Sequence, residues 1–146
     1  MTGTLLQLNV SKGGMPKLPV LFARVTPGGI DGDWQKNRKY HGGEDRAVCL
    51  FSVELYDWLR GHAIDLKHGS VGENFTTRGV DLDALKPRDR LRVGACVIEI
   101  TDVRVPCRNL KKWDDDLPEL IVGFSGWVAK VVTEGTVQPN DAVETL

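Results

Sequence analysis

The sequence predicts a mostly β domain, an antiparallel barrel or sandwich with a few short helices. Short apolar runs recur along the chain, some alternating with polar residues, and turn-forming residues separate them. The expected strands lie at residues 4–10, 20–25, 46–53, 90–93, 96–101, 127–133 and 142–146. Gly94 and Ala95 stand between two of these runs, which is typical of a tight hairpin.

One helix is expected to begin after Ser52 and to end at Gly61. The Ser52 hydroxyl can accept a hydrogen bond from the first helical turn, and glycine commonly ends a helix. The residues at helical spacing, which we expect to pack on the core, are Leu55, Trp58, Leu59 and His62. A second short helix is expected near Pro118, after a run of three aspartates.

Length and composition favour one domain. The chain has 146 residues, of which 41% are apolar and 27% charged, so one core can form without disulfides. We therefore expect residues 1–146 to form a single domain. A net charge of −1 argues against a nucleic-acid partner, although basic residues outnumber acidic ones in the first third of the chain.

No membrane partner or export signal is expected. The longest fully apolar stretch, residues 47–51, is far too short to cross a bilayer. Residues 1–4 lack the basic segment followed by an apolar one that is typical of a signal peptide. The expected location is the cytoplasm, where cysteines stay reduced.

The three cysteines differ in their surroundings. Cys49 and Cys96 lie within apolar strands and are expected to be small core residues. Cys107 follows a proline at a turn, between Arg104 and Arg108, and positive neighbours favour a thiolate. A thiolate can bind a soft metal or carry a persulfide sulfur, and the residues alone leave both roles open.

Three loops carry further candidate groups. Residues 11–17 form a glycine turn in which Lys12 can meet an anion, although a plain turn also fits. His41 can donate to a ligand or act as a general acid, or it can simply brace its loop, and Arg46 is a candidate anion contact. Asn74 can read the edge of a heterocycle or form an Asx turn.

Taken in order, seven segments resemble the MOSC domain family, named for the C-terminal domain of molybdenum cofactor sulfurases. The resemblance is to the stand-alone bacterial members and covers nearly the whole chain. The segments are SKGGMPK (11–17), GIDGD (29–33), HGGEDRAVCLFS (41–52), GSVGENFT (69–76), DRLRVG (89–94), VPC (105–107) and GWVAKVV (126–132).

The resemblance implies a MOSC-type β-barrel that binds the molybdenum cofactor, a pterin dithiolene with a phosphate tail. It implies that Cys107 is the molybdenum ligand and a catalytic residue, and that His41 is a second catalytic residue. The residues implied to line the cofactor site are Lys12, Arg46, Asn74 and Thr76.

The function implied is a molybdenum-dependent oxidoreductase that reduces a small N-hydroxylated substrate. An external electron-transfer protein is expected, because no flavin, NAD or iron–sulfur motif is visible. Two alternatives stay open: a sulfur carrier with a persulfide on Cys107, and a cofactor-binding protein without catalysis. A homodimer also stays open.

Overall fold

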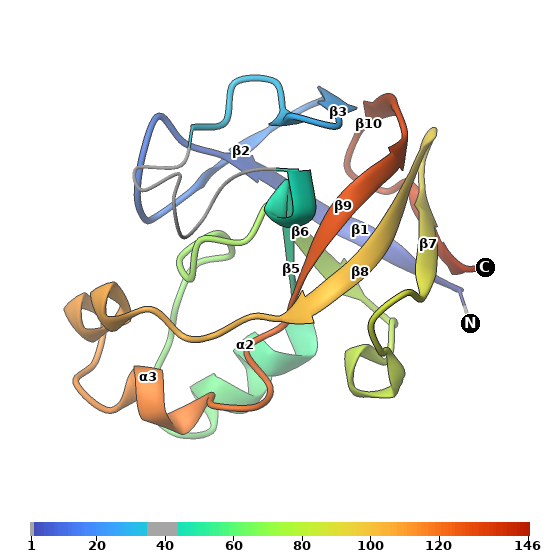
Figure 1. Cartoon of the computed structure of the whole chain (residues 1–146). Coiled ribbons are helices and arrows are strands. Elements are labelled where there is room, and N and C mark those ends of the chain that lie inside the picture. The colour runs from blue at the N-terminus through green and yellow to red at the C-terminus, as the bar shows by residue number, and fades with distance from the viewer. Residues whose placement is uncertain (1, 35–43) are drawn as a thin grey trace.

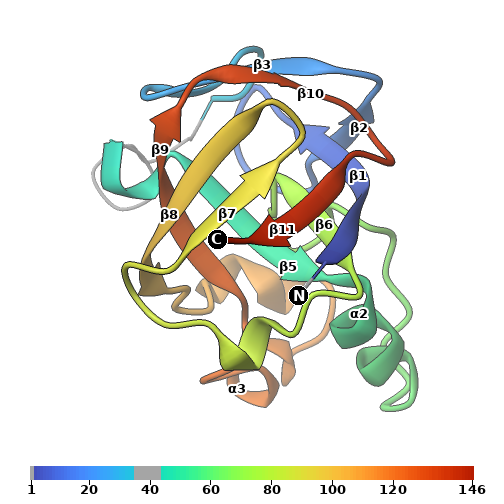
Figure 2. The ribbon, with the colours of Figure 1, turned by 90° about the vertical axis from the view of Figure 1, so that its right-hand side faces the viewer.

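The computed structural model describes residues 2–34 and 44–146, and its centre is a closed barrel of seven strands. Around the barrel the order is β11, β7, β8, β9, β5, β6 and β1, and β1 pairs with β11 to close it (Figure 2). The strands are β1 (Thr2–Val10), β5 (Val48–Ser52), β6 (Phe75–Arg78), β7 (Arg90–Val93), β8 (Cys96–Val103), β9 (Trp127–Thr133) and β11 (Ala142–Thr145). The predicted mostly β barrel is confirmed.

Four short strands accompany the barrel. β2 (Leu18–Val20) pairs with the last residues of β1. A small second sheet has the order β10 (Gly135–Val137), β3 (Ala23–Thr26) and β4 (Gly29–Ile30). This sheet covers one end of the barrel and contributes Val25, Ile30 and Val137 to the barrel core (Figure 2).

The helices are short. α2 (Val53–Arg60) and α3 (Leu117–Leu120) lie at the end of the barrel away from β3 and β10 (Figure 1). Residues 2–34 and 44–146 also contain three 3-10 helices: η1 (Glu44–Arg46), η2 (Leu82–Ala84) and η3 (Arg108–Lys112). In the described part of the chain, no helix is long and apolar enough to cross a membrane.

Local signals for α2 are confirmed, whereas its predicted buried face is confirmed only in part, because Leu59 is buried but Trp58 and His62 are exposed. The Ser52 hydroxyl accepts a hydrogen bond from the Leu55 N–H at 3.1 Å, and Gly61 follows the last helical residue. The buried side chains of the helix are Val53, Tyr56 and Leu59. Trp58 is 38% exposed, because the helix turns Tyr56 and Leu59 toward a core beneath β5.

The strand predictions fail where the chain bends or where strand residues are polar. The run at 20–25 contains the end of β2 and most of β3, separated by the exposed Leu21 and Phe22. The run at 46–53 begins in η1 rather than in a strand. β6 was not predicted, because Thr76 and Thr77 are polar although both are buried.

Two cores share β5 as a wall. Leu50 belongs to the cluster inside the barrel, whereas Phe51 belongs to a second cluster that contains Tyr56 and Leu110. Successive side chains of a strand point to opposite faces, so one strand serves both cores. The second core holds the segment that follows Cys107 against the barrel, because Leu110 is fully buried in it.

Candidate functional site

The candidate site begins where β5 and β6 start. These strands are parallel, with Leu50 opposite Phe75, so their first residues lie at the same end of the pair. The Asn74 N–H donates to the Cys49 carbonyl at 2.9 Å, and the Cys49 N–H donates to the Asn74 side-chain oxygen at 3.0 Å. Asn74 therefore ties the loop before β6 to the start of β5.

The other half of the Asn74 amide is also engaged. Its nitrogen donates to the Asn9 carbonyl at 3.2 Å and to the Asp33 carboxylate at 3.0 Å. With 1% of its surface exposed, Asn74 joins β5, the end of β1 and the loop at 31–34. Its side chain is thus a buried link between protein segments.

A buried ion pair fixes the predicted glycine turn. The Lys17 ammonium lies 2.7 and 2.9 Å from the two oxygens of Asp33, and the Ser11 N–H donates to Asp33 at 2.9 Å. Both charged side chains are almost fully buried, so each neutralises the other. The Lys17–Asp33 pair holds both ends of the turn at 11–17 beside Asn74.

Glu73 is the second buried carboxylate beneath this end of the barrel. One of its oxygens accepts from the Tyr56 hydroxyl at 2.8 Å, and the other accepts from Thr76 at 2.8 Å and from the Gly69 N–H at 3.1 Å. Burial raises the pKa of Glu73, while the hydrogen bonds from Tyr56 and Thr76 oppose that rise. Thr76 also accepts from the Asn9 amide at 3.0 Å, so its hydroxyl is enclosed.

Three segments that are distant in sequence meet around Gly72. The Arg104 guanidinium donates to the Val71 carbonyl, and the Trp113 indole N–H donates to the Ser70 carbonyl at 2.9 Å. A Cβ on Gly72, where φ is +89°, would lie 3.1 Å from a carbon of Met15. The segments at 11–17, 69–74 and 104–113 therefore pack against one another.

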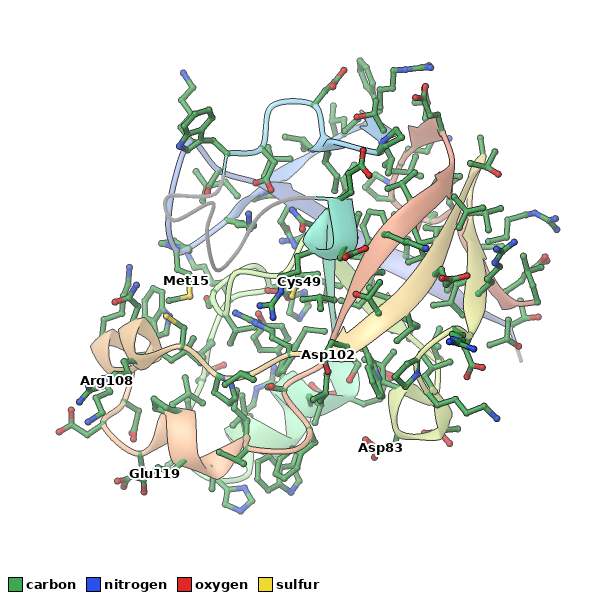
Figure 3. The ribbon with its side chains drawn as sticks, in the orientation of Figure 1. Met15, Cys49, Asp83, Asp102, Arg108 and Glu119 are labelled. Carbon is green, nitrogen blue, oxygen red and sulfur yellow. The ribbon has the colours of Figure 1, made fainter. Side chains whose placement is uncertain are left out.

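Lys112 adds a further link by donating to the Met15 carbonyl. In Figure 3, Met15 and Cys49 lie on the side of the molecule where the turn at 11–17 approaches the segment leading to Arg108. The structure thus brings together the glycine turn at 11–17, the loop at 69–74 and the segment at 104–113 that contains Cys107.

Cys107 sits at the bend that leads into η3. Its carbonyl accepts from the Leu110 N–H at 3.0 Å, and its side chain makes no capping hydrogen bond to the helix. The side chain is half-buried. A thiol in this position is held by its backbone and remains accessible.

Arg104 is the least satisfied buried polar group of the site. One terminal nitrogen of its guanidinium donates to Val71, whereas the other is buried and has no hydrogen-bond partner. A buried charged donor without a partner is costly, so it marks a position where an anion would be stabilised. The neighbouring Cys49 thiol has its pKa raised by burial, and the charge of Arg104 opposes that rise.

The remaining predicted residues are placed differently. Lys12 is exposed on the glycine turn. Arg46 is exposed in η1 and borders a separate hollow of about 410 Å³, together with Arg88 and Glu99. His41 lies outside the described residues. Within residues 2–34 and 44–146, no group of three or more His, Cys, Asp or Glu residues could hold a metal ion.

The roles of Asp33, Glu73 and Lys17 were not predicted from the sequence, in which Arg104 figures only as a neighbour of Cys107. A signal existed for the first two, since both lie in the segments GIDGD and GSVGENFT. Nothing in the sequence indicates that Lys17 pairs with Asp33, because sixteen positions separate them.

The comparisons with known proteins identify the family. The MOSC domain profile matches residues 37–144. The chain belongs to the MOSC domain family. This family is associated with the molybdenum cofactor. Among curated proteins, the chain is 30% identical over 123 residues to the uncharacterized protein YflK of Bacillus subtilis (strain 168), and 31% identical over 130 residues to protein YiiM of Escherichia coli (strain K12).

These MOSC relatives are longer than the chain. The alignments cover 80% and 84% of this chain but 55% and 58% of YflK and YiiM, so the chain spans little more than half of their length. Solved structures share the fold. YiiM from Geobacillus stearothermophilus has a TM-score of 0.79 at 24% identity, over 99% of this chain and 75% of the other. The YUAD protein of Bacillus subtilis has a TM-score of 0.84 at 18% identity, over 99% and 96%.

Proposed function

We propose that this MOSC domain binds the molybdenum cofactor where the segments at 11–17, 69–74 and 104–113 meet. The observation that carries the proposal is that the short segment 104–107 contains two side-chain groups available to a ligand. Cys107 offers an accessible thiol, and Arg104 offers a buried guanidinium nitrogen without a partner. Family membership supplies the kind of ligand.

These two groups fit the chemistry of the cofactor. A metal that arrives held by dithiolene sulfurs needs one further soft ligand, and a cysteine thiolate provides it. An anionic group next to Arg104 would receive a charge-assisted hydrogen bond from the free guanidinium nitrogen. The phosphate tail is the group of the cofactor that needs such a cation.

The other predicted cofactor residues take different parts in the proposal. Asn74 and Thr76 are positioning residues, because every polar atom of their side chains is engaged within the protein. Lys12 lies on the exposed glycine turn, where its flexible ammonium can approach an anion. Arg46 and His41 stay candidates on the family resemblance.

We further propose that the loaded domain reduces N-hydroxylated small molecules. The bound cofactor supplies the two-electron redox chemistry. The N–O bond breaks, two electrons and two protons are consumed, and the amine and one water molecule leave. The electrons come from an external electron-transfer protein. In this scheme Cys107 holds the metal, Arg104 orients the cofactor, and the buried Lys17–Asp33 pair keeps the turn at 11–17 in place.

The proposal treats residues 1–146 as a single MOSC domain. The barrel core that supports it runs from Leu5 to Val143, so both ends of the described chain contribute to one cluster. The second core shares β5 with the barrel core, which supports treating both as parts of one unit.

The test uses the full chain expressed in a host that makes the cofactor. Molybdenum by metal analysis and pterin by fluorescence should co-purify with the wild type. Cys107→Ala should retain pterin and lose reduction of an N-hydroxylated base analogue, whereas Cys96→Ala, which changes a buried strand cysteine, should behave as wild type. Absence of both molybdenum and pterin from the wild type would overturn the proposal.

The same samples decide between the proposal and the sulfur-carrier alternative. Mass spectrometry of the peptide that contains Cys107 should find the unmodified thiol. A peptide heavier by one sulfur atom, from protein without molybdenum, would assign the chain to sulfur transfer instead.

A further inference from the structure

A groove of about 840 Å³ lies at the other end of the β5–β6 pair from the candidate cofactor site. Its walls are the first turns of α2, the loop that follows β6 and the loop before β9. Cys49 and Asn74 lie at the start of the two parallel strands. Ser52 ends β5 and Gly79 follows β6, and both border the groove. In Figure 3, Asp83 of this groove lies well apart from Met15 and Cys49.

One wall of the groove is aromatic. The rings of Trp58 and Phe124 meet edge to face with their centroids 5.2 Å apart. Trp58 is 38% exposed, and its ring also lies beside that of His62, with the centroids 4.2 Å apart. Exposed apolar surface of this kind is typical of an interaction site.

The rim of the groove is acidic. Glu54, Asp81 and Asp83 line it, and no lysine, arginine or histidine is among the described residues that do so. The Glu54 carboxylate accepts a hydrogen bond from the Gly79 N–H at 2.9 Å, which holds it at the rim. The groove therefore combines fixed negative charge with aromatic faces.

We propose that this acidic groove docks a basic, apolar peptide segment of a partner protein. Lysine or arginine side chains of the segment pair with Asp81 and Asp83, and a cationic or apolar side chain packs on Trp58. The occupant is a peptide segment because Asp81 and Asp83 lie on a different wall of the groove from the aromatic rings, so one small cation does not contact both. The residues that line the groove are not those of the candidate cofactor site, so this docking does not depend on the cofactor.

The experiment titrates the full chain, labelled with ¹⁵N, with an acetylated and amidated peptide of alternating lysine and leucine. The backbone amide resonances of residues 54–58, 79–83 and 123–124 should shift, and the affinity should fall as salt is added. A peptide with glutamate in place of lysine should leave these resonances unchanged.

Matched variants locate the contact. The double variant Asp81→Asn/Asp83→Asn should weaken binding by about fivefold, the loss expected for two exposed ion pairs. The control Asp115→Asn/Glu119→Gln removes the same charge from an exposed region outside the groove and should bind as wild type. Equal weakening by both double variants would overturn the proposal, because it would indicate attraction by net charge alone.

Two other outcomes would also overturn it. Binding of n-butylammonium as tight as that of the peptide would make the groove a site for small cations. Concentration-dependent shifts of the groove resonances without any peptide would make it a contact between two copies of this chain.

Discussion

The loop at 69–76 and the segment at 104–107 both border the candidate cofactor site, yet they differ in how their polar groups are satisfied. In the first, the side chains of Glu73, Asn74 and Thr76 are buried and bonded to other parts of the chain. In the second, one guanidinium nitrogen of Arg104 has no hydrogen-bond partner, and the Cys107 thiol makes no capping hydrogen bond to η3.

This difference separates two kinds of motif residue. A buried polar group that is fully bonded stabilises one arrangement of the loops, so its loss is expected to cost stability. A group left without a partner contributes little to the fold and is available for a ligand. Substitutions in the two segments should therefore differ in the property they change, stability in the first and ligand binding in the second.

The largest effect is expected from Asn74→Ala. The change leaves the Cys49 N–H and the Asn9 carbonyl without their side-chain partner and the Asp33 carboxylate with one donor fewer. We expect the free energy of unfolding to fall by about 3 kcal/mol, since buried groups lose their partners. Urea denaturation measures it, with Asn109→Ala, an exposed amide, as the control that should stay near wild type.

The next effect is a pH dependence carried by Glu73. Burial raises its pKa above the usual 4.5, so the folded chain binds this proton more tightly than the unfolded chain does. The contribution of Glu73 to stability should therefore be largest below pH 4.5 and be lost as the pH rises through the raised pKa. The total loss is about 1.4 kcal/mol for each unit by which folding raises the pKa.

The variant Glu73→Gln isolates this contribution, because it keeps the shape of the side chain and cannot ionise. The unfolding temperature is measured from pH 4 to pH 8, an interval chosen to bracket the usual pKa of glutamate. It should fall less steeply with pH for Glu73→Gln than for the wild type. Glu119→Gln, which changes an exposed carboxyl, should follow the wild type. Parallel curves of unfolding temperature against pH for all three proteins would refute the assignment of this pH dependence to Glu73.

A smaller effect is expected from Arg104→Met. In the absence of ligand, the free energy of unfolding of the variant should lie within about 1 kcal/mol of that of the wild type. The substitution removes an unpaired buried charge together with one hydrogen bond. Inorganic phosphate at ten times its dissociation constant should stabilise the wild type by about 1.4 kcal/mol and leave Arg104→Met unchanged. Differential scanning fluorimetry at constant ionic strength checks this, and equal stabilisation of both would remove Arg104 from the anion site.

Local features could be predicted from the sequence because their causes lie within a few residues. The hairpin at Gly94 follows from a glycine between two apolar runs, and β7 and β9 have the predicted bounds. The start of α2 follows from Ser52, whose partner is three residues away. The mostly β barrel follows from many such short elements.

The site network could not be predicted, because its contacts join distant segments. The Asn74 amide meets a carbonyl 65 positions away, and the parallel pairing of β5 with β6 that brings them together leaves no local pattern. Asn74 was therefore expected to face a ligand or to bond its own turn, and its side chain instead bonds β1, β5 and Asp33. Whether the Arg104 guanidinium finds a hydrogen-bond partner likewise depends on tertiary packing, which has no local sequence pattern.

The central claim is that the Cys107 thiol, which makes no capping hydrogen bond in the fold, binds the metal of the cofactor. Cys107→Ala should unfold with the free energy of the wild type to within about 0.5 kcal/mol, because its half-buried side chain makes no capping bond. The most direct measurement is X-ray absorption at the molybdenum edge on the loaded wild type, Cys107→Ala and Cys96→Ala. The account predicts one sulfur neighbour fewer around molybdenum in Cys107→Ala alone, and an unchanged sulfur count in that variant would contradict it.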